Sequence, residues 1–394
     1  MSNKDQIVIV EAVRTPMGGF QGSLSAVAAP VLGSVAIAGV VKRSGIANDQ
    51  IDEVIMGCVL PAGLGQAPAR QAALKADLSL GTVCTTINKV CGSGMKAVMM
   101  AHDFIAAGSA NIVIAGGMEN MSQSPYMLPK ARAGFRMGHG EVKDHMFLDG
   151  LEDAETSRSM GTFAQETADQ QQFSRQQMDD FAITSLNRAN AAIASGAFDN
   201  EIAPVTITSR RGEVVVAIDE QPGNAKIDKI PSLRPAFAKD GTITAANSSS
   251  ISDGASALLI MKASEAAKRG LTPMATIVAH ATHAQHPSEF TVAPVGAMNK
   301  LLEKANWSVA DVDLFEINEA FAMVTMLGIK ALELDPTKVN INGGACALGH
   351  PLGSSGSRVI VTLLHALKNQ GLSKGVASLC IGGGEATAIA VEML

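Results

Sequence analysis

Short runs rich in valine and isoleucine alternate along this chain with longer segments of helical periodicity, and this alternation constrains the fold more than any other feature. The runs occupy residues 7–10, 53–58, 83–87 and 111–115 in the first part of the chain, and residues 275–279, 314–317, 339–341, 376–381 and 387–391 in the last part. Strands that alternate with helices form α/β folds whose sheets are mostly parallel and buried. The sequence therefore predicts such a fold.

The two ends of the chain also share a layout. The segments GVVKRSGIANDQIDEVIMG and NKLLEKANWSVADVDLFEIN each contain a basic helix end, a short turn, an acidic step and an apolar strand. A turn of glycine and serine, a helix and a glycine-terminated strand occupy residues 91–117 and again 354–384. Both repeats are separated by about 260 residues, which predicts two similar halves whose corresponding turns meet at one seam. Residues 118–242 are richer in charged residues than the rest of the chain and show little strand periodicity, which indicates an excursion from this scaffold.

Composition excludes several classes of protein. Apolar residues make up 47% of the 394 residues and charged residues 17%, so a disordered segment is excluded. A net charge of -6 at pH 7 argues against a nucleic-acid partner. The uncharged residues 15–41 are interrupted by five glycines and by Pro30, so we expect no membrane span. An apolar run begins at residue 6, and we therefore expect no leader peptide. A soluble enzyme is the leading class.

The five cysteines are scattered and never spaced C-x-x-C. This pattern argues against a disulfide framework and a thiolate zinc cluster, and it favours a reducing compartment. The strongest candidate for chemistry among them is Cys91, in NKVCGSGMKAVMMAHDFIAAG. It follows an apolar strand and opens a helix, and Gly92 and Gly94 allow the close backbone approach that a turn with an exposed nucleophile requires. Amides and the dipole at a helix start favour the thiolate. The alternative is a buried structural cysteine.

Two further segments contain residues that could serve that cysteine. His350 lies in NGGACALGHPLGSSGSR, in a turn before a helix that runs to about residue 368. A neutral imidazole there could activate a thiol. Cys380 ends a buried strand in SLCIGGGEA, and the amides of residues 382–384 could form an oxyanion hole. Taken alone, each has a structural alternative, namely a loop histidine and a core cysteine.

Other polar residues give weaker signals. Asn318 and Glu319, in EINEAFA, either cap the following helix or reach a site. His280, His283 and His286 lie in one strand-to-loop stretch without an H-E-x-x-H pattern. We therefore predict no metal site.

In this order and near these intervals, the segments NKVCGSGMKA, NEAFA, NGGACALGHPLGSSGSR and CIGGG resemble the thiolases. The resemblance is greatest to the acetyl-CoA acetyltransferase branch and runs from Glu11 to the C-terminus. It implies an α/β thiolase fold of five αβαβα layers, built from two similar halves with an inserted loop domain. The implied domains are an N-terminal half (residues 1–118 and 243–271), a loop domain (119–242) and a C-terminal half (272–394).

The resemblance also implies roles for individual residues. Cys91 matches the nucleophile that takes an acyl group from an acyl-CoA thioester, and His350 matches the base that activates it. Cys380 matches the acid/base that handles the second substrate. Asn318, acting through a water and together with His350, matches the pair that holds the thioester oxygen. The N–H groups of Cys91 and Gly382 match a second oxyanion hole. The implied reaction is a reversible Claisen condensation of two acetyl-CoA molecules to acetoacetyl-CoA and CoA through an acetyl-cysteine.

The positions that bind coenzyme A in the thiolases are matched less completely in this sequence. Ser159 stands where many relatives have histidine, and only Lys226 and Lys229 are available in place of a basic residue near the adenine. Phe290 lies where short-chain members wall the acyl pocket. The positions that match the pantetheine channel are Leu151, Met160, Phe237, Ala245, Ser249 and Phe321.

The implied partners are acetyl-CoA, acetoacetyl-CoA and CoA, with no cofactor beyond these substrates. Active members are dimers or tetramers, so we expect a homo-oligomer, either a dimer or a homotetramer, with the charged residues 130–153 as a contact loop. We expect a cytoplasmic location. The nearest alternative is a degradative 3-ketoacyl-CoA thiolase for longer chains. A ketosynthase, a non-catalytic acyl-CoA binder and a zinc-dependent hydrolase are more distant alternatives.

Overall fold

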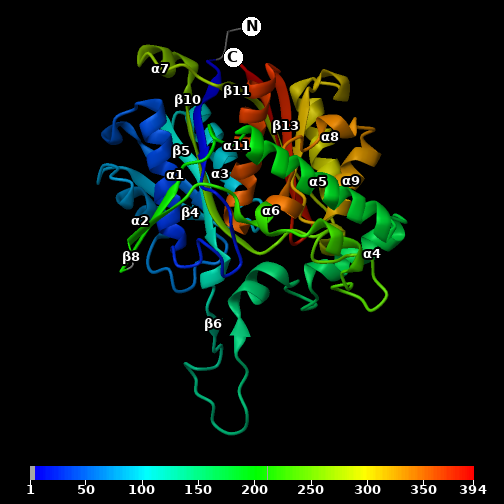
Figure 1. Ribbon diagram of the computed structural model, residues 1–394. Helices are drawn as coiled ribbons and strands as arrows, with labels where there is room; N and C mark the ends of the chain where they lie inside the picture. The colour runs from blue at the N-terminus through cyan, green and yellow to red at the C-terminus, as the bar shows by residue number, and fades with distance from the viewer. Residues whose placement is uncertain (1–4, 211) are drawn as a thin grey trace.

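The structure is a computed structural model that describes residues 5–210 and 212–394. Its centre is a ten-stranded sheet (Figure 1). The strands are β1 (Ile7–Arg14), β2 (Gly18–Gly19), β3 (Glu53–Gly57), β4 (Val83–Ile87), β5 (Ile112–Asn120), β10 (Ser252–Lys262), β11 (Ala275–Ala284), β12 (Leu314–Ile317), β13 (Lys374–Ile381) and β14 (Glu385–Met393). Their order across the sheet is β12-β13-β14-β11-β1-β10-β5-β3-β4, and β2 pairs with β10.

The sheet consists of two units that are joined by very few paired residues. Strands β1 and β11 pair only where Val8 meets Thr276 and Ile9 meets Ala275. On one side of this joint lie β1, β10, β5, β3 and β4, and on the other lie β11, β14, β13 and β12. Alternate side chains of each strand enter different cores, because successive residues point to opposite faces of a sheet. Val8 thus packs in one cluster and Ile9 in the next.

Helices cover both faces of each unit. The helices are α1 (Ala29–Ser44), α2 (Pro68–Lys75), α3 (Ser93–Ala107), α8 (Ala293–Ala305), α9 (Ala322–Ala331) and α11 (Leu352–Gln370). Helices α1 and α2 share a core with the outer face of the first unit, and α8 packs on the outer face of the second, with α9 beside it. Helices α3 and α11 fill the core between the two units. The predicted order of five layers is confirmed.

The predicted repeat is also confirmed. Helix α1 leads into β3 as α8 leads into β12, and α3 leads into β5 as α11 leads into β13. The paired central helices approach closely through Gly94 and Gly356. A Cβ on Gly94 would lie 2.7 Å from the backbone nitrogen of Ser357, and one on Gly356 would lie 2.4 Å from that of Met95. The two glycines therefore allow the seam between the halves to form.

The prediction of mostly parallel sheets is wrong. Among the strands that the structure describes, only the pairs β3–β4, β3–β5 and β12–β13 are parallel, while β1, β10, β11 and β14 pair with their neighbours antiparallel. The turn at residues 382–384 is too short for a crossover, so β13 and β14 can only be antiparallel. The strand expected at 339–341 is a single bridge between Val339 and Phe315. Strand β10 was not predicted, because its first five residues are small or polar.

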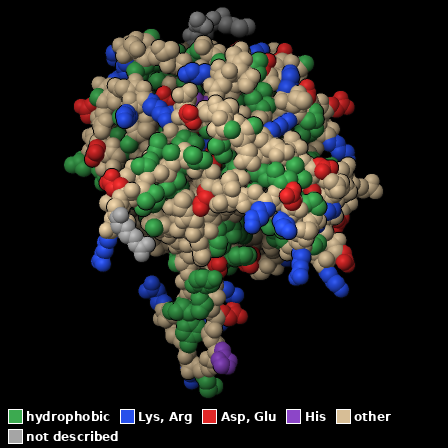
Figure 2. Space-filling model, in the orientation of Figure 1, with side chains coloured by type: hydrophobic (Ala, Val, Ile, Leu, Met, Phe, Trp, Pro, Cys, Tyr) green, Lys and Arg blue, Asp and Glu red, His purple; other side chains and the backbone are tan. Residues whose placement is uncertain are grey.

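The excursion from the scaffold carries several helices and short strands. These are β6 (Tyr126–Met127), β7 (Lys143–Asp144), α4 (Met160–Gln170), α5 (Arg175–Ser195), β8 (Val205–Ser209), β9 (Gly212–Val216) and α6 (Glu220–Asn224), followed beyond β10 by α7 (Ala263–Lys268). Strands β6 and β7 form the base of an arm that projects from the body (Figures 1 and 2). The proposed boundaries at 119 and 242 stay a prediction. In the described part of the chain no helix is long and apolar enough to cross a membrane.

Candidate active site

Cys91 lies in a strained turn between β4 and α3. The residue before it, Val90, has φ of +45°, which is rare for a β-branched residue and marks a backbone held by its surroundings. Gly92 closes the turn against the other half of the molecule, because a Cβ there would lie 2.3 Å from the side chain of Ile381. The predicted close approach is confirmed, and the turn presents a half-buried cysteine at the seam.

The electrostatics of Cys91 differ from the prediction. Burial raises the pKa of its thiol to about 11, although two backbone N–H groups, those of Gly382 and of Cys91 itself, hydrogen-bond to the sulfur and lower it. The expectation that the helix start favours a thiolate is therefore wrong for the unliganded site, because desolvation outweighs the amides. The same two amides are the pair expected to hold an oxyanion.

His350 is buried, and its hydrogen bonds fix its tautomer. The hydroxyl of Ser355 donates to the carbonyl of Pro351 at 2.9 Å, so its single proton is already used. The 2.5 Å contact between His350 Nδ1 and Ser355 Oγ must then be an N–H donated by the ring. Nε2 consequently carries a lone pair, and this buried atom has no protein partner among the described residues. Burial lowers the pKa of His350 to about 3, and the charge of Arg358 lowers it further, so the ring is neutral.

Asn318 follows β12 and is oriented by Arg358 of α11. The guanidinium donates to Asn318 Oδ1 at 3.2 Å, which turns Nδ2 the other way and leaves this buried donor without a partner in the described part of the chain. Glu316 lies 3.7 Å from Arg358. Burial nevertheless raises the pKa of Glu316 to about 8. Arg358 therefore orients the side chain of Asn318 by a hydrogen bond and lowers the pKa of His350 by its charge.

Cys380 is the inner of the two sulfurs. It is fully buried at the end of β13 and packs in a cluster with Phe290 and Phe321. Burial raises its pKa well above the usual value, and the proximity of Cys91 raises it further. Only the N–H of Cys380 itself lowers that pKa by hydrogen bonding.

A single cavity of about 230 Å³ joins these residues. Cys91, His350, Cys380 and Gly382 all line it, as the sequence analysis predicted, whereas Asn318 is not among the lining residues. Of the positions matched to a pantetheine channel, five line the cavity: Leu151, Met160, Phe237, Ser249 and Phe321. Ser159 and Phe290 line it as well.

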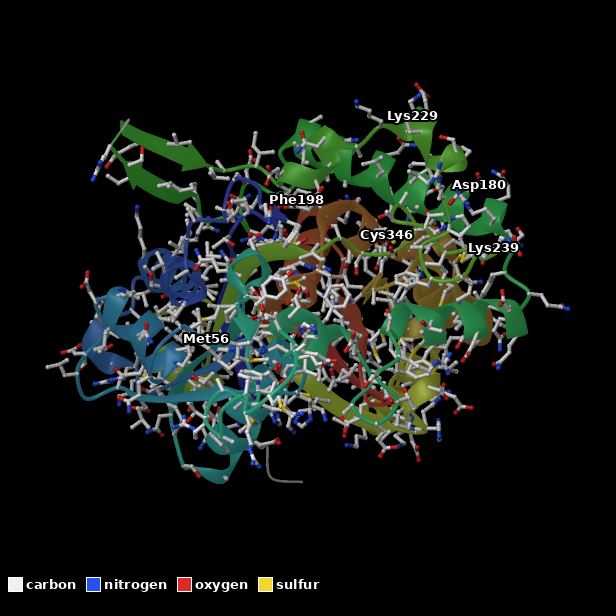
Figure 3. The ribbon with its side chains drawn as sticks, turned by 90° about the horizontal axis from the view of Figure 1, so that it is seen from below. Met56, Asp180, Phe198, Lys229, Lys239 and Cys346 are labelled. Carbon is white, nitrogen blue, oxygen red and sulfur yellow. The ribbon has the colours of Figure 1, made fainter. Side chains whose placement is uncertain are left out.

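Ala245 lies elsewhere. It lines a second cavity of about 310 Å³ together with Lys226, Lys229 and Cys346. Figure 3 views this region from below and labels Lys229 and Cys346. Ala245 therefore does not share a cavity with the five other predicted positions.

Glu319 neither caps α9 nor reaches the cavity. Helix α9 has Phe321 at its N-cap position and no side-chain cap. The Glu319 carboxylate instead accepts hydrogen bonds from Ser185 Oγ at 2.7 Å, Asn340 Nδ2 at 2.9 Å and the N–H of Cys346 at 3.1 Å. It thereby fastens α5 of the excursion to the loop that leads to the catalytic histidine candidate.

Three residues of the site were not predicted from the sequence: Glu119, Ser355 and Arg358. Glu119, at the end of β5, accepts hydrogen bonds from three backbone N–H groups: those of Val59, Leu60 and Gly353. Burial raises its pKa to about 7. Gly353 belongs to the first turn of α11, so Glu119 fixes the start of the helix that carries Ser355 and Arg358. A buried carboxylate inside an apolar strand, in IAGGMEN, was the available signal.

Comparisons with known proteins agree with this arrangement. The family "Thiolase, N-terminal domain" matches residues 7–264, and "Thiolase, C-terminal domain" matches residues 271–393. The chain is 48% identical over 388 residues to the acetyl-CoA acetyltransferase of Cupriavidus necator, covering 98% of this chain and 99% of that protein. It is 48% identical to a probable acetyl-CoA acetyltransferase of Dictyostelium discoideum, covering 100% of this chain and 95% of that protein.

Two solved structures share the fold. A crystal structure of the Bacillus anthracis acetyl-CoA acetyltransferase superposes with a TM-score of 0.97 at 42% identity and covers 99% of each chain. The Acat5 thiolase from Ascaris suum, solved in complex with coenzyme A, superposes with a TM-score of 0.93 at 41% identity and covers 99% of this chain and 100% of that one.

Proposed function

This chain belongs to the thiolase family, and from that membership we propose that its cavity joins two acetyl-CoA molecules into acetoacetyl-CoA and CoA. The protein is an acyltransferase, an enzyme of the acetyl-CoA C-acetyltransferase type. The observation that carries the proposal is the meeting of Cys91, His350, Cys380 and Gly382 around one cavity.

The first half of the reaction forms an acetyl-enzyme. His350 Nε2 takes the proton from Cys91 as its sulfur attacks the thioester carbon. The N–H groups of Cys91 and Gly382, which already face that sulfur, hold the tetrahedral oxyanion. The carbon–sulfur bond to CoA then breaks, and His350 returns the proton to the departing CoA sulfur. The products are acetyl-Cys91, free CoA and a neutral His350.

The second half forms the carbon–carbon bond. His350 takes the thiol proton of Cys380, and the resulting thiolate removes an α-proton from a second acetyl-CoA. The charged ring of His350 holds the enolate oxygen together with Asn318 Nδ2, which acts through a water because Asn318 does not line the cavity. These donors lower the cost of deprotonation by a sulfur base. The enolate carbon attacks acetyl-Cys91, the carbon–sulfur bond breaks, and Cys91 recovers its proton from His350. Every proton is accounted for, and the reverse direction is thiolysis.

The size of the cavity supports a short acyl group. Phe290 and Phe321 form part of its wall and meet edge to face, with ring centroids 6.4 Å apart. A volume of about 230 Å³ must hold the end of a pantetheine arm as well as the acyl group. A degradative thiolase for longer chains is the alternative, and the ratio of kcat/KM for acetoacetyl-CoA to that for 3-ketohexadecanoyl-CoA separates the two.

The partners follow from the same proposal. The partners are acetyl-CoA, acetoacetyl-CoA and CoA, and no cofactor beyond these thioesters takes part in the chemistry. We place the enzyme in the cytoplasm as a homo-oligomer, a dimer or a tetramer. The arm supports this assembly, because it exposes large apolar side chains that a monomer would leave in water, namely Tyr126, Leu128, Phe135, Met137 and Val142 (Figure 2).

The decisive experiment traps the covalent intermediate. The full-length protein is incubated with acetyl-CoA, quenched in acid and digested, and the acetylated peptide is identified by mass spectrometry. We expect one acetyl group on Cys91 and none in the Cys91→Ala variant. An acetyl group on Cys380, or acyl transfer at near wild-type rate in Cys91→Ala, would refute the assignment.

A further inference from the structure

Two histidines from different halves of the molecule meet at one carboxylate on the surface. His102 and Asp103 lie near the end of α3, and His280 lies in β11. His280 Nε2 is 2.9 Å and His102 Nδ1 is 3.0 Å from the same oxygen, Asp103 Oδ1. The two ring nitrogens are themselves 3.3 Å apart. Three potential ligand atoms therefore form a nearly equilateral triangle.

The size of this triangle matches the coordination shell of a small divalent ion. Four ligands at zinc–nitrogen and zinc–oxygen distances are about 3.3 Å from one another in a tetrahedron. Three ligands on one face of an octahedron are about 3.0 Å apart. The observed separations of 2.9, 3.0 and 3.3 Å span these two values. We propose that His102, Asp103 and His280 form a site for one first-row divalent transition ion, such as zinc.

The chemistry of the three side chains fits this occupant. A neutral imidazole and an ionised carboxylate are the forms that bind such metals. The nearby cation does not compete for the ligand atoms, because Lys304 Nζ bonds to the backbone carbonyl of His280 at 3.1 Å.

The site is accessible and has room for further ligands. The exposed fractions of the side chains of His102, His280 and Asp103 are 24%, 17% and 54%. His102 also lines a shallow surface cleft with Glu392. Water can therefore complete the coordination of an ion held by the three protein ligands.

A bound ion would join the two halves of the molecule. Helix α3 belongs to the first half and starts beside Cys91, whereas β11 opens the second half. His102 lies eleven residues along the chain from Cys91, roughly 16 Å at the helical rise, so the ion is remote from the reaction. Its effect is to stabilise the contact between α3 and β11, and the proposal is independent of the proposed reaction.

Titration of the full-length, chelator-treated protein with Co²⁺ tests the site. We expect one Co²⁺ bound per chain, with the visible bands of a four- to six-coordinate ion and no sulfur-to-cobalt charge-transfer band in the near ultraviolet. His280→Gln and His102→Gln should each weaken binding at least tenfold, because each removes a direct ligand. His139→Gln, on the exposed arm, and Cys91→Ala are the controls and should bind as the wild type does.

A second measurement does not depend on variants. In the proton spectrum of the cobalt-loaded wild-type protein, we expect two exchangeable imidazole N–H signals shifted far from the diamagnetic range, one from each histidine. Absence of binding, a charge-transfer band that disappears in Cys91→Ala, or unchanged affinity in both histidine variants would overturn the proposal. In that case the three side chains form a hydrogen-bonded cluster only.

Discussion

The two halves of this molecule are related in layout, and each contributes one cysteine to the cavity, but they hold these sulfurs in different surroundings. Cys91 is half-buried at the start of a helix and has two backbone N–H groups directed at it. Cys380 is fully buried at a strand end and has only its own N–H. Burial raises the pKa of Cys91 to about 11 and that of Cys380 well above its usual value.

This difference assigns the sulfurs to different steps. An acyl group on Cys91 places its carbonyl oxygen near two amides, which stabilise a tetrahedral oxyanion. The apolar surroundings of Cys380 make its thiolate unstable and therefore strongly basic once it forms. Duplication of a fold thus does not duplicate the chemistry, because the number of N–H donors and the access of water around each sulfur decide its role.

The largest expected effect comes from Cys380→Ser. We expect condensation to fall about 10³-fold or more, because a hydroxyl cannot replace the acid/base group. Exchange of radiolabelled CoA into acetyl-CoA, which needs only Cys91 and His350, should stay within a few-fold of the wild-type rate. Cys84→Ser, a half-buried cysteine outside the cavity, is the matched control. Equal loss of condensation and exchange would contradict the division of roles.

The pH dependence of alkylation tests the state of Cys91 directly. With a pKa of about 11, the thiolate fraction rises as pH rises towards that value. The rate of inactivation by iodoacetamide should therefore increase about tenfold for each pH unit between about 7 and 9, without a plateau. His350 is neutral throughout this range because its pKa is about 3. A plateau below pH 9 would instead show a preformed thiolate.

Features of the two cysteine sites that depend on local sequence pattern could be predicted. The motif around Cys91 predicted its turn and helix, and the repeat predicted that this turn would meet the corresponding turn near residue 354, where Gly94 and Ser357 approach closely. Local pattern does not report desolvation, so the pKa of Cys91 was predicted in the wrong direction. Strand direction was also wrong, because the pairing of β1 with β10 joins segments that are separated by the whole excursion.

The positioning residues were hidden for a related reason. Ser355 and Arg358 belong to a helix of which nearly every residue is buried, and serine in such a helix is typical of close packing. Their contacts with His350 and Asn318 depend on where the ring nitrogens and amide atoms lie in the folded structure, and the sequence does not contain this information. Glu119 is similar, since its three amide partners come from distant segments.

Ser355→Ala should slow the reactions of both Cys91 and Cys380, because both thiols lose their proton to the same tautomer of His350. Without the acceptor at Nδ1, the ring can rotate or carry its proton on Nε2, and we expect kcat to fall roughly 30-fold with KM nearly unchanged. The matched control is Ser357→Ala, a buried serine of the same helix that bonds to Ser256 at 2.7 Å. Equal losses in the two variants would indicate a packing effect instead.

Arg358 offers a way to separate orientation from charge. Arg358→Lys keeps a cation but not the planar donor to Asn318, so kcat should fall about tenfold while the acidic limb of the pH profile stays in place. Arg358→Gln also removes the charge that lowers the pKa of His350, so that limb should move to higher pH. Thermal unfolding of both variants serves as the control for stability. An unchanged limb in Arg358→Gln would contradict the electrostatic role.

The smallest effect is expected in the apolar wall beside Cys380. Phe290 contacts Phe321 and belongs to the cluster that contains Cys380. Phe290→Ala should lower kcat/KM for acetoacetyl-CoA about threefold. It should also raise the relative activity toward a six-carbon 3-ketoacyl-CoA, because the smaller side chain leaves room for additional methylene groups, each of which a pocket distinguishes by about 10- to 200-fold. Phe198→Leu, in a different core cluster, is the control. If chain-length preference does not change, Phe290 and Phe321 only keep water away from the sulfur of Cys380. The length of the acyl group is then limited by other residues of the cavity.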